Sequence, residues 1–348
     1  MTCLTKEGRN NSLSYIRAIG CIGVVLLHAV FTGNMLFLDS LNANQNLEAQ
    51  IIENLMMWAV PSFIMVTGAL SLEPNKKIPL KKLFGKNIFK IIKSIVFFTI
   101  VYSIFDMAMN GEGFTSAGVM LGISNILTGD GWAHMWYMYM LIGIYLLMPV
   151  YKLVTDNGSN RILKYFIAVY IIFVAIIPLF QVFNLKCGFY IHERNIYPCY
   201  LFLGYAINKE IIELDKRKSV IMILVSAIAV GTLTIVGFRN DIQNISLMWG
   251  YSSVLVVIGS AGIFGFIDNI ESSKPGLFGR FLIKLDSCSF GIYLIHMIFL
   301  RLIMTHLNIN PFEYGGIWAF LPVTVFVVAI SWIITIVMKR IPILRSFI

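Results

Sequence analysis

The 348-residue chain carries little charge. Asp, Glu, Lys and Arg together make up 13% of its residues, whereas a soluble domain carries about a quarter. Hydrophobic residues make up 58%, and the mean hydropathy is +0.79. This shortage of charge excludes an ordinary soluble enzyme and predicts an integral membrane protein that lies almost wholly within the bilayer.

The chain also lacks the cysteine pattern of a metal or redox site. Its five cysteines include no Cys-x-x-Cys pair, so we expect neither a zinc site nor a redox motif. Cys187 and Cys199 share a predicted external loop and could pair, but the sequence does not place their Cα atoms. A cleavable signal peptide is not expected, because the first apolar run is long enough to span and lacks a small-residue cleavage site.

Ten apolar runs are long enough to cross a bilayer. They predict an all-α polytopic protein, with one membrane-embedded domain over residues 1–348 and no soluble domain or linker between spans. The sixth run is short and the ninth carries polar residues, so these two spans are the weakest predictions. The runs lie near 14–36, 51–72, 88–109, 133–151, 162–181, 197–212, 219–238, 246–267, 286–306 and 316–338.

Basic residues give an independent test of this partition, because cytoplasmic loops are enriched in Lys and Arg. One set of alternate loops holds 21 of the 27 basic residues and the opposite set holds three, while Arg17, Lys93 and Arg301 fall within spans. The bias predicts that both termini are cytoplasmic. It also explains most of the net charge of +9, so nucleic acid is not an expected partner and membrane lipid is.

Arg17 and His28 form the most informative pair, eleven residues apart in the first run. At about 100° per residue, eleven steps return to nearly the same helix face, ~16 Å further along the axis. Ionisable groups inside a membrane are costly and indicate function. The pair predicts a polar path into the membrane. The structural alternatives are a snorkelling anchor for Arg17 and a helix–helix hydrogen bond for His28.

Further polar residues map to the predicted outer half of other spans. Glu53, Asp106 and His134 lie there together with His28, and a carboxylate beside an imidazole would orient a general base. The sequence does not reveal which of these groups meet. His296 lies near the middle of the ninth run, where a buried hydrogen-bonding partner is a more common role than catalysis.

Two other segments carry weaker signals. Trp136 and Tyr137 follow His134 and could contact a substrate or form an interfacial aromatic belt. Pro61 in the second run predicts a kink, and Thr67 followed by Gly68 predicts close helix packing.

A basic stripe precedes the third span. Lys86, Lys90 and Lys93 lie at positions i, i+4 and i+7 of one helical face that enters the membrane. The stripe predicts a phosphate clamp for a soluble cytoplasmic donor. Attraction to anionic lipid headgroups is the structural alternative.

These motifs, in this order, resemble the acyltransferase-3 family of bacterial integral-membrane acyltransferases over roughly residues 13–338. Arg17, ten residues and then His28 are similar to the family's Arg-x10-His signature. Residues 61–68 (Pro-Ser-Phe-Ile-Met-Val-Thr-Gly) resemble its proline- and phenylalanine-containing stretch. The lysine segment ending at Lys90 resembles its basic segment. Residues 134–139 and 291–296 resemble its His-Leu-Trp-Phe and Tyr-Leu-Ile-His elements.

The resemblance implies an O-acyltransferase that moves an acetyl group from cytoplasmic acetyl-CoA to a carbohydrate hydroxyl at the outer face of a bacterial plasma membrane. It implies His28 as the catalytic residue and Arg17 as a donor-binding or structural partner. Lysine stands at 86 and 90, where relatives often have arginine, so phosphate recognition there would be looser or lipid-directed. No metal is expected.

From the residues themselves, we expect His134 to assist catalysis and Lys86 and Lys90 to bind the donor phosphates. We expect four other residues to contact the acceptor, and we leave Thr67, Tyr137 and Tyr293 as unassigned candidates for an oxyanion donor. The four expected acceptor contacts are Glu53, Trp136, Tyr137 and His296.

Other readings stay open at this point. A polytopic transporter or exporter of a small polar solute or glycan precursor would also have ten spans and ionisable groups at mid-membrane. A scaffold in a glycan-synthesis complex would tolerate substitution of Arg17 and His28. The glycan acceptor, the acyl chain length, an acyl-histidine intermediate and the oligomeric state are not readable from the sequence.

Overall fold

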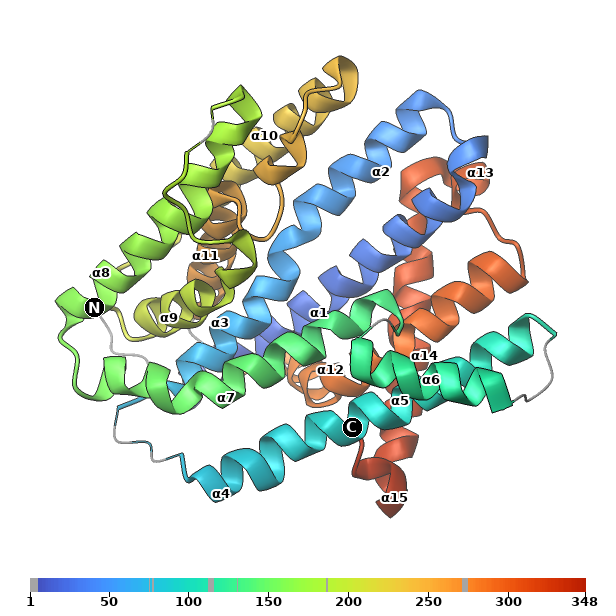
Figure 1. The fold of residues 1–348 in the computed structure, drawn as a ribbon, viewed down its shortest axis with the longest axis horizontal. Helices are drawn as coiled ribbons and strands as arrows, with labels where there is room; N and C mark the ends of the chain where they lie inside the picture. The colour runs from blue at the N-terminus through green and yellow to red at the C-terminus, as the bar shows by residue number, and fades with distance from the viewer. Residues whose placement is uncertain are drawn as a thin grey trace.

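The computed structural model describes residues 6–74, 76, 78–111, 116–129, 131–185, 187–270 and 275–348. Every regular element in these ranges is a helix, which confirms the predicted all-α class (Figure 1). Three of the basic residues counted above, Lys77, Lys186 and Lys274, lie outside the described residues. The α-helices are α1 (Lys6–Phe37), α2 (Ala43–Leu55), α3 (Ala59–Ser71), α4 (Leu80–Lys82), α5 (Phe89–Met109), α6 (Ser116–Thr128), α7 (Trp136–Asp156), α8 (Asn160–Tyr170), α9 (Tyr197–Asn208), α10 (Lys216–Asn240), α11 (Val254–Asp268), α12 (Leu277–Arg301), α13 (Pro311–Gly315), α14 (Phe320–Arg340) and α15 (Pro342–Arg345).

Eight continuous helical segments are long and apolar enough to cross a membrane in the part of the chain that the structure describes. They match eight of the ten predicted spans, and short 3-10 or π turns join their pieces. Several extend beyond the predicted runs because their basic or amphipathic ends remain helical outside the apolar window. The segments are Asn11–Ser40, Ala43–Ser71, Leu80–Met109, Ala133–Asp156, Asn160–Phe183, Lys216–Asn240, Leu277–His306 and Pro311–Arg340.

The sixth and eighth predicted spans are shorter than expected. α9 has 12 residues and α11 has 15, whereas a helix needs about 20 to cross a bilayer core. α9 ends at Asn208, two residues before Glu210 takes a left-handed φ of 58°. α11 begins at Val254 because Ser253 caps it, accepting a hydrogen bond from the Leu255 N–H.

The second span breaks where its proline predicted a kink. α2 ends at Leu55, a 3-10 turn covers Met56–Trp58, and α3 begins at Ala59, two residues before Pro61. Proline has no N–H to continue the α-helical ladder, so the chain tightens just ahead of it. On the far side of this turn, α2 packs against α10.

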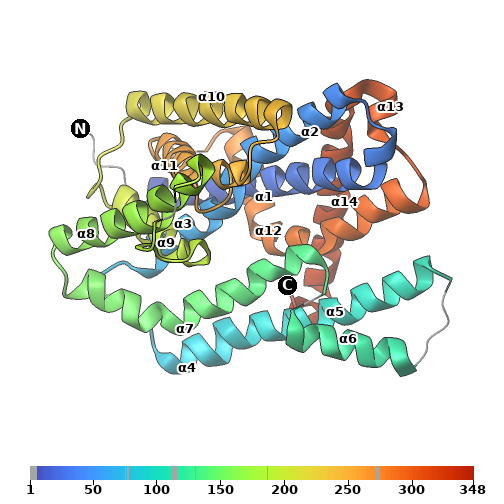
Figure 2. The same cartoon turned by 45° about the horizontal axis from the view of Figure 1, so that its top comes forward.

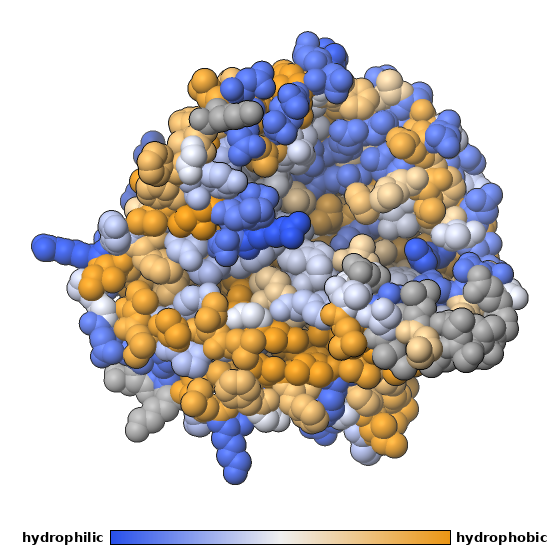
Figure 3. All heavy atoms as spheres, in the orientation of Figure 1, coloured by the Kyte–Doolittle hydropathy of each residue, from blue (hydrophilic) through white to orange (hydrophobic). Residues whose placement is uncertain are grey.

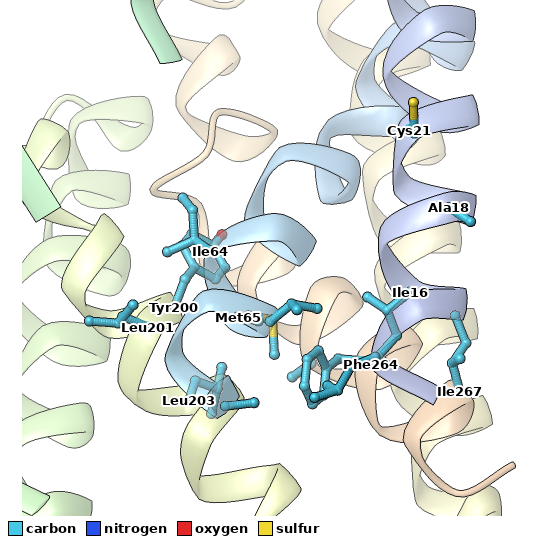
Figure 4. Close-up of a cluster of buried hydrophobic side chains, with 14 of the residues drawn as sticks. Ile16, Ala18, Cys21, Ile64, Met65, Tyr200, Leu201, Leu203, Phe264 and Ile267 are labelled. Atoms are coloured by element: carbon cyan, nitrogen blue, oxygen red, sulfur yellow. The ribbon is translucent and has the colours of Figure 1, made fainter. Parts of the chain in front are cut away.

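The core is built around close contacts between small residues. A Cβ on Gly68 of α3 would lie 1.8 Å from the carbonyl oxygen of Leu201 on α9, and one on Gly204 would lie 2.2 Å from that of Met65. This confirms the predicted close packing at Gly68. Figure 4 shows buried side chains of α1, α3, α9 and α11 gathered in this core, with Phe264 near Ile16 and Met65.

α1 runs through the middle of the bundle beside α12 and α14, while α10 and α11 lie along one side (Figure 2). α1 and α12 are parallel, because contacts between them join rising residue numbers on both helices. On the face shown in Figure 3, hydrophobic residues gather over the lower part, and hydrophilic residues gather at the upper right. The bundle thus has polar surface at the end where α1 finishes and α2 begins.

Candidate active site

A cavity of about 920 Å³ lies at the end of the bundle that the charge bias predicts to be extracytoplasmic. His28, Glu53, Asp106, His134 and Trp136 all line it, although they come from five separate helical elements. The structure therefore brings together the polar residues that the sequence placed in the outer half. Two predicted acceptor contacts differ: His296 is completely buried, and neither it nor Tyr137 is among the residues that line the cavity.

Hydrogen bonds fix the tautomers of two histidines. Nδ1 of His296 lies 2.7 Å from the carbonyl oxygen of Tyr293, and a carbonyl accepts, so Nδ1 carries a proton. Nε2 of a neutral His296 is then an acceptor, and it receives a hydrogen bond from Nδ1 of His28 at 2.8 Å. This leaves Nε2 of His28 unprotonated, in a half-buried side chain that lines the cavity.

The partner of His28 is thus a second imidazole, and not either of the carboxylates, Glu53 and Asp106, that map to the same depth. His296 lies on α12, which packs along α1. The rings of His28 and His296 stack with their centroids 5.0 Å apart. When Nε2 of His28 takes up a proton, Nδ1–H still faces a neutral nitrogen that can accept it. His296 therefore orients the ring and supports its charged form.

His134 completes a cluster of three imidazoles. It sits in a 3-10 turn before α7, 3% exposed, with its ring centroid 5.4 Å from that of His296 and 6.2 Å from that of His28. The Tyr102 hydroxyl donates to the carbonyl of Leu294, so Nε2 of His134 donates to the Tyr102 oxygen at 3.0 Å. In the described ranges, no set of three metal-ligand side chains is arranged to hold an ion.

The His134 ring also carries a buried nitrogen that lacks a partner. Nδ1 has no hydrogen-bond partner among the described residues. An unsatisfied buried acceptor costs about 1–3 kcal/mol. The ring is therefore held in an unfavourable place next to His28.

Two of the three oxyanion-donor candidates are already engaged. Thr67 Oγ1 donates to the carbonyl of Phe63 at 2.8 Å, and the Tyr293 hydroxyl donates to the carbonyl of His134. Each hydroxyl has a single proton. Neither can donate to a reacting oxygen without giving up its present bond: the Thr67 bond lies within α3, and the Tyr293 bond is made to the backbone of His134.

Arg17 is engaged by a residue that the sequence argument did not use. Its Nε and one Nη each lie 2.7 Å from an oxygen of Asp286 on α12, in a bidentate ion pair whose carboxylate is 7% exposed. The signal for this partner was an acidic residue near the predicted inner end of the ninth run. The periodicity did not reveal it, because the ten residues from Asp286 to His296 do not return to the same helix face.

A second cavity, of about 610 Å³, lies at the opposite end of the bundle from the histidines. The predicted stripe of Lys86, Lys90 and Lys93 lines it. Lys339 and Arg345, which the sequence assigned only to a cytoplasmic loop, line it too. We call this site the basic pocket.

Two side chains of the basic pocket contact α12 close to Asp286, the partner of Arg17. Lys339 donates a hydrogen bond to the carbonyl of Ser287, the residue after Asp286. Lys90 lies over the ring of Phe290 on α12, with Nζ 5.4 Å from its centroid. Both contacts are made to α12, the helix that carries His296 at its other end.

Asp106, Trp132 and Arg301 line the same cavity as His28 and His134, which we call the histidine cavity. Asp106 accepts a hydrogen bond of 2.7 Å from the indole N–H of Trp132 and one of 2.8 Å from Arg301. The Trp132 ring stacks on Tyr102 with centroids 4.3 Å apart. The sequence placed Arg301 within a span but gave it no role.

Comparison with known families identifies the chain. Residues 10–336 match the model of the family described as an acyltransferase domain, Acyl_transf_3. The comparisons with curated proteins and with solved structures gave no match. The matched region covers nearly the whole chain and includes Arg17, His28, His134 and His296, whereas Lys339 and Arg345 of the basic pocket lie beyond it. The protein is therefore a multi-pass membrane acyltransferase that belongs to the acyltransferase-3 family.

Proposed function

We propose that the protein is an O-acetyltransferase of the bacterial plasma membrane, which moves an acetyl group from cytoplasmic acetyl-CoA to a hydroxyl of a cell-surface or lipid-linked glycan at the outer face. The observation that supports this most is the contact between Nδ1 of His28 and Nε2 of His296. It leaves an unprotonated Nε2 at the cavity, which is what deprotonation of an alcohol requires.

The two cavities suit the two substrates. A coenzyme A nucleotide carries several phosphates, and the basic pocket offers five cationic side chains to them, which are Lys86, Lys90, Lys93, Lys339 and Arg345. Lys90 and Tyr102 lie on the same helix, twelve residues and thus ~18 Å apart along its axis. An extended pantetheine arm would cover that distance and bring the thioester beside the histidines.

The chemistry then follows from the tautomers. The acceptor hydroxyl gives its proton to Nε2 of His28 while its oxygen attacks the acetyl carbonyl. The C–O bond forms, the C–S bond breaks, and the leaving thiolate takes the proton back from His28. His296 holds the imidazolium through Nδ1–H during the transfer. The His28 residue is the catalytic base, and His296 is a positioning residue.

Arg17 takes a positioning role in this proposal. Because Nε and one Nη are occupied by Asp286, the bidentate edge of the guanidinium is not available to a donor phosphate. The ion pair joins α1 to α12 ~16 Å below His28. It sets the register in which His28 meets His296 on the same two helices.

The test uses the full chain in nanodiscs with ¹⁴C-acetyl-CoA, comparing wild type with His28→Ala in the presence and absence of glycan extracts. We expect release or transfer of label by wild type and loss of at least a hundredfold in the variant. His28→Ala leaves Nε2 of the buried His296 without its hydrogen bond, at a cost of about 1–3 kcal/mol, so the amount of inserted protein is measured alongside activity. Absence of donor binding and turnover in wild type would favour the transporter reading, and full activity of the variant would remove His28 from the mechanism.

A further inference from the structure

Arg301 is a cation within a predicted span that the proposed acetyl transfer does not use. It lines the same cavity as His28, at the end of α12 and five residues beyond His296. That offset corresponds to ~7.5 Å further toward the predicted outer face. An ionisable side chain in such a place is costly and calls for a function.

The guanidinium is held rigidly by two neighbours. Its Cζ lies 4.6 Å from the centroid of the Trp132 ring, and one Nη donates to Asp106 at 2.8 Å. Asp106 also accepts from the indole N–H of that same tryptophan. The three side chains thus form a closed triangle that fixes the plane of the guanidinium.

The triangle leaves part of the guanidinium open. The contact with Asp106 uses a single Nη, and no acceptor for Nε or the other Nη is found among the described residues. The Arg301 side chain is 48% exposed. These two nitrogens form the edge of the fork that matches the paired oxygens of a carboxylate or a phosphate.

The same geometry disfavours stacking of a neutral sugar at this wall. Tyr102 lies 4.3 Å from the Trp132 centroid and Arg301 lies 4.6 Å from it. Two groups this close to one ring centre must lie on opposite faces of the ring. Trp132 has no free face for the ring of a carbohydrate, and the group exposed to the cavity is the cationic edge.

We infer that Arg301 is a specificity-determining residue that binds an anionic group of the acceptor, a carboxylate or phosphate about one sugar residue away from the hydroxyl that is acetylated. The inference rests on the proposed acetyl transfer and names the class of acceptor. Asp106 keeps the guanidinium oriented, so that the anion meets a preformed fork. The anion could be carried by the sugar itself or by a lipid.

The experiment measures kcat/KM for acetyl transfer from ¹⁴C-acetyl-CoA by the full chain in nanodiscs. Three probes are compared: methyl glucoside, methyl glucuronoside and glucose 1-phosphate. Each is measured in nanodiscs of phosphatidylcholine alone and of phosphatidylcholine with phosphatidylglycerol. The enzymes are wild type, Arg301→Gln, Arg301→Lys and the control Arg239→Gln, which alters an exposed arginine at the same predicted face and outside the cavity.

We expect wild type to favour at least one of the two anionic sugars by about tenfold over the neutral one, the discrimination of one bidentate charge-assisted contact. The ratio should fall to about one in Arg301→Gln and to an intermediate value in Arg301→Lys, which keeps the charge but loses the fork. Arg239→Gln should keep the wild-type ratio. Which anionic sugar is favoured distinguishes a carboxylate from a phosphate.

Several outcomes would overturn the inference. Equal use of all three sugars, including use of none, would do so, as would a preference that persists in Arg301→Gln. A response to phosphatidylglycerol that is the same for every sugar would assign Arg301 to lipid headgroups. Loss of transfer to all sugars in both Arg301 variants would show that Arg301 is needed for the structure of the protein and not for recognition of the acceptor. Acetyl-CoA hydrolysis that depends on His28 is measured in parallel, because its absence would instead defeat the proposed function.

Discussion

His28 donates a 2.8 Å hydrogen bond to His296 across the interface of two parallel helices. The acceptor is itself fixed by a backbone carbonyl, that of Tyr293. A carbonyl cannot change its role from acceptor to donor. The backbone of α12 therefore sets the direction of both hydrogen bonds, the one from His296 to the Tyr293 carbonyl and the one from His28 to His296. The unprotonated nitrogen of His28 at the cavity is the consequence.

Replacement of His296 with Phe should lower kcat by about a hundredfold, because it removes the group that orients His28 and accepts the hydrogen bond from its Nδ1–H. KM for acetyl-CoA should change less than twofold, since His296 is buried away from the basic pocket. His296→Gln keeps an acceptor near the Nε2 position and should recover part of kcat. Steady-state kinetics in nanodiscs give both constants. An unchanged kcat in His296→Phe would contradict the positioning role.

Removal of one partner of the Arg17–Asp286 pair should destabilise the protein more than removal of both. Asp286 is 7% exposed but Arg17 is 33% exposed, so we expect Arg17→Met to cost about 3 kcal/mol, the lower end for an uncompensated buried charge. The double variant Arg17→Met/Asp286→Leu should recover part of this loss. Midpoints of thermal unfolding in detergent for wild type, Arg17→Met, Asp286→Leu and the double variant measure the coupling in one double-mutant cycle. Purely additive effects would contradict the pairing.

Gly68→Ala should disrupt the contact between α3 and α9. The added Cβ would lie 1.8 Å from the Leu201 carbonyl oxygen, so the helices must separate, at a cost of at least 1–3 kcal/mol (about the range for overpacked cores). Gly143→Ala on α7 is the matched control, because its Cβ would meet nothing within 4 Å. The control should be neutral or slightly stabilising. Equal thermal midpoints for the two variants would show that the close approach is not needed.

Neutralisation of the basic pocket should weaken donor binding. Lys90→Gln combined with Lys339→Gln should raise KM for acetyl-CoA by about tenfold with little change in kcat, because both line the basic pocket away from the histidines. Lys164→Gln, an exposed lysine at the same predicted face that does not line the pocket, is the control. The comparison is repeated with acetyl-3′-dephospho-CoA, whose KM should rise less. A KM equal to that of wild type would indicate that these lysines contact anionic lipid headgroups and do not bind the donor.

Local patterns in the sequence were sufficient for the class and much of the topology. Length and hydropathy predicted helices because a spanning segment must satisfy its own backbone hydrogen bonds. The break near Pro61 and the close contact at Gly68 also followed from the residue itself, since the missing N–H of proline and the missing Cβ of glycine act locally. The sixth run already looked short, but the full extent of both shortenings was not predicted, because the left-handed φ of Glu210 after α9 and the Ser253 cap that begins α11 are features that hydropathy does not register.

The sequence also grouped several residues that line the histidine cavity and the basic pocket, without revealing their partners. His28, Glu53 and His134 were grouped by depth, and depth follows from counting residues along each span. The pairings of His28 with His296 and of Arg17 with Asp286 join residues 268 and 269 positions apart. Such contacts depend on which helices are neighbours and how each is rotated.

The amino-acid sequence by itself determined that this protein is a membrane-embedded helical bundle, and where the eight long apolar helices of its described residues run. Those properties follow from hydropathy, charge bias and residue spacing, which act within one segment. The tertiary structure alone decided that an imidazole supports His28, that Asp286 occupies Arg17, and that Arg301 keeps a free edge at the cavity. These depend on helix packing, because a side chain's hydrogen-bond partners are set by the neighbouring helix that faces it.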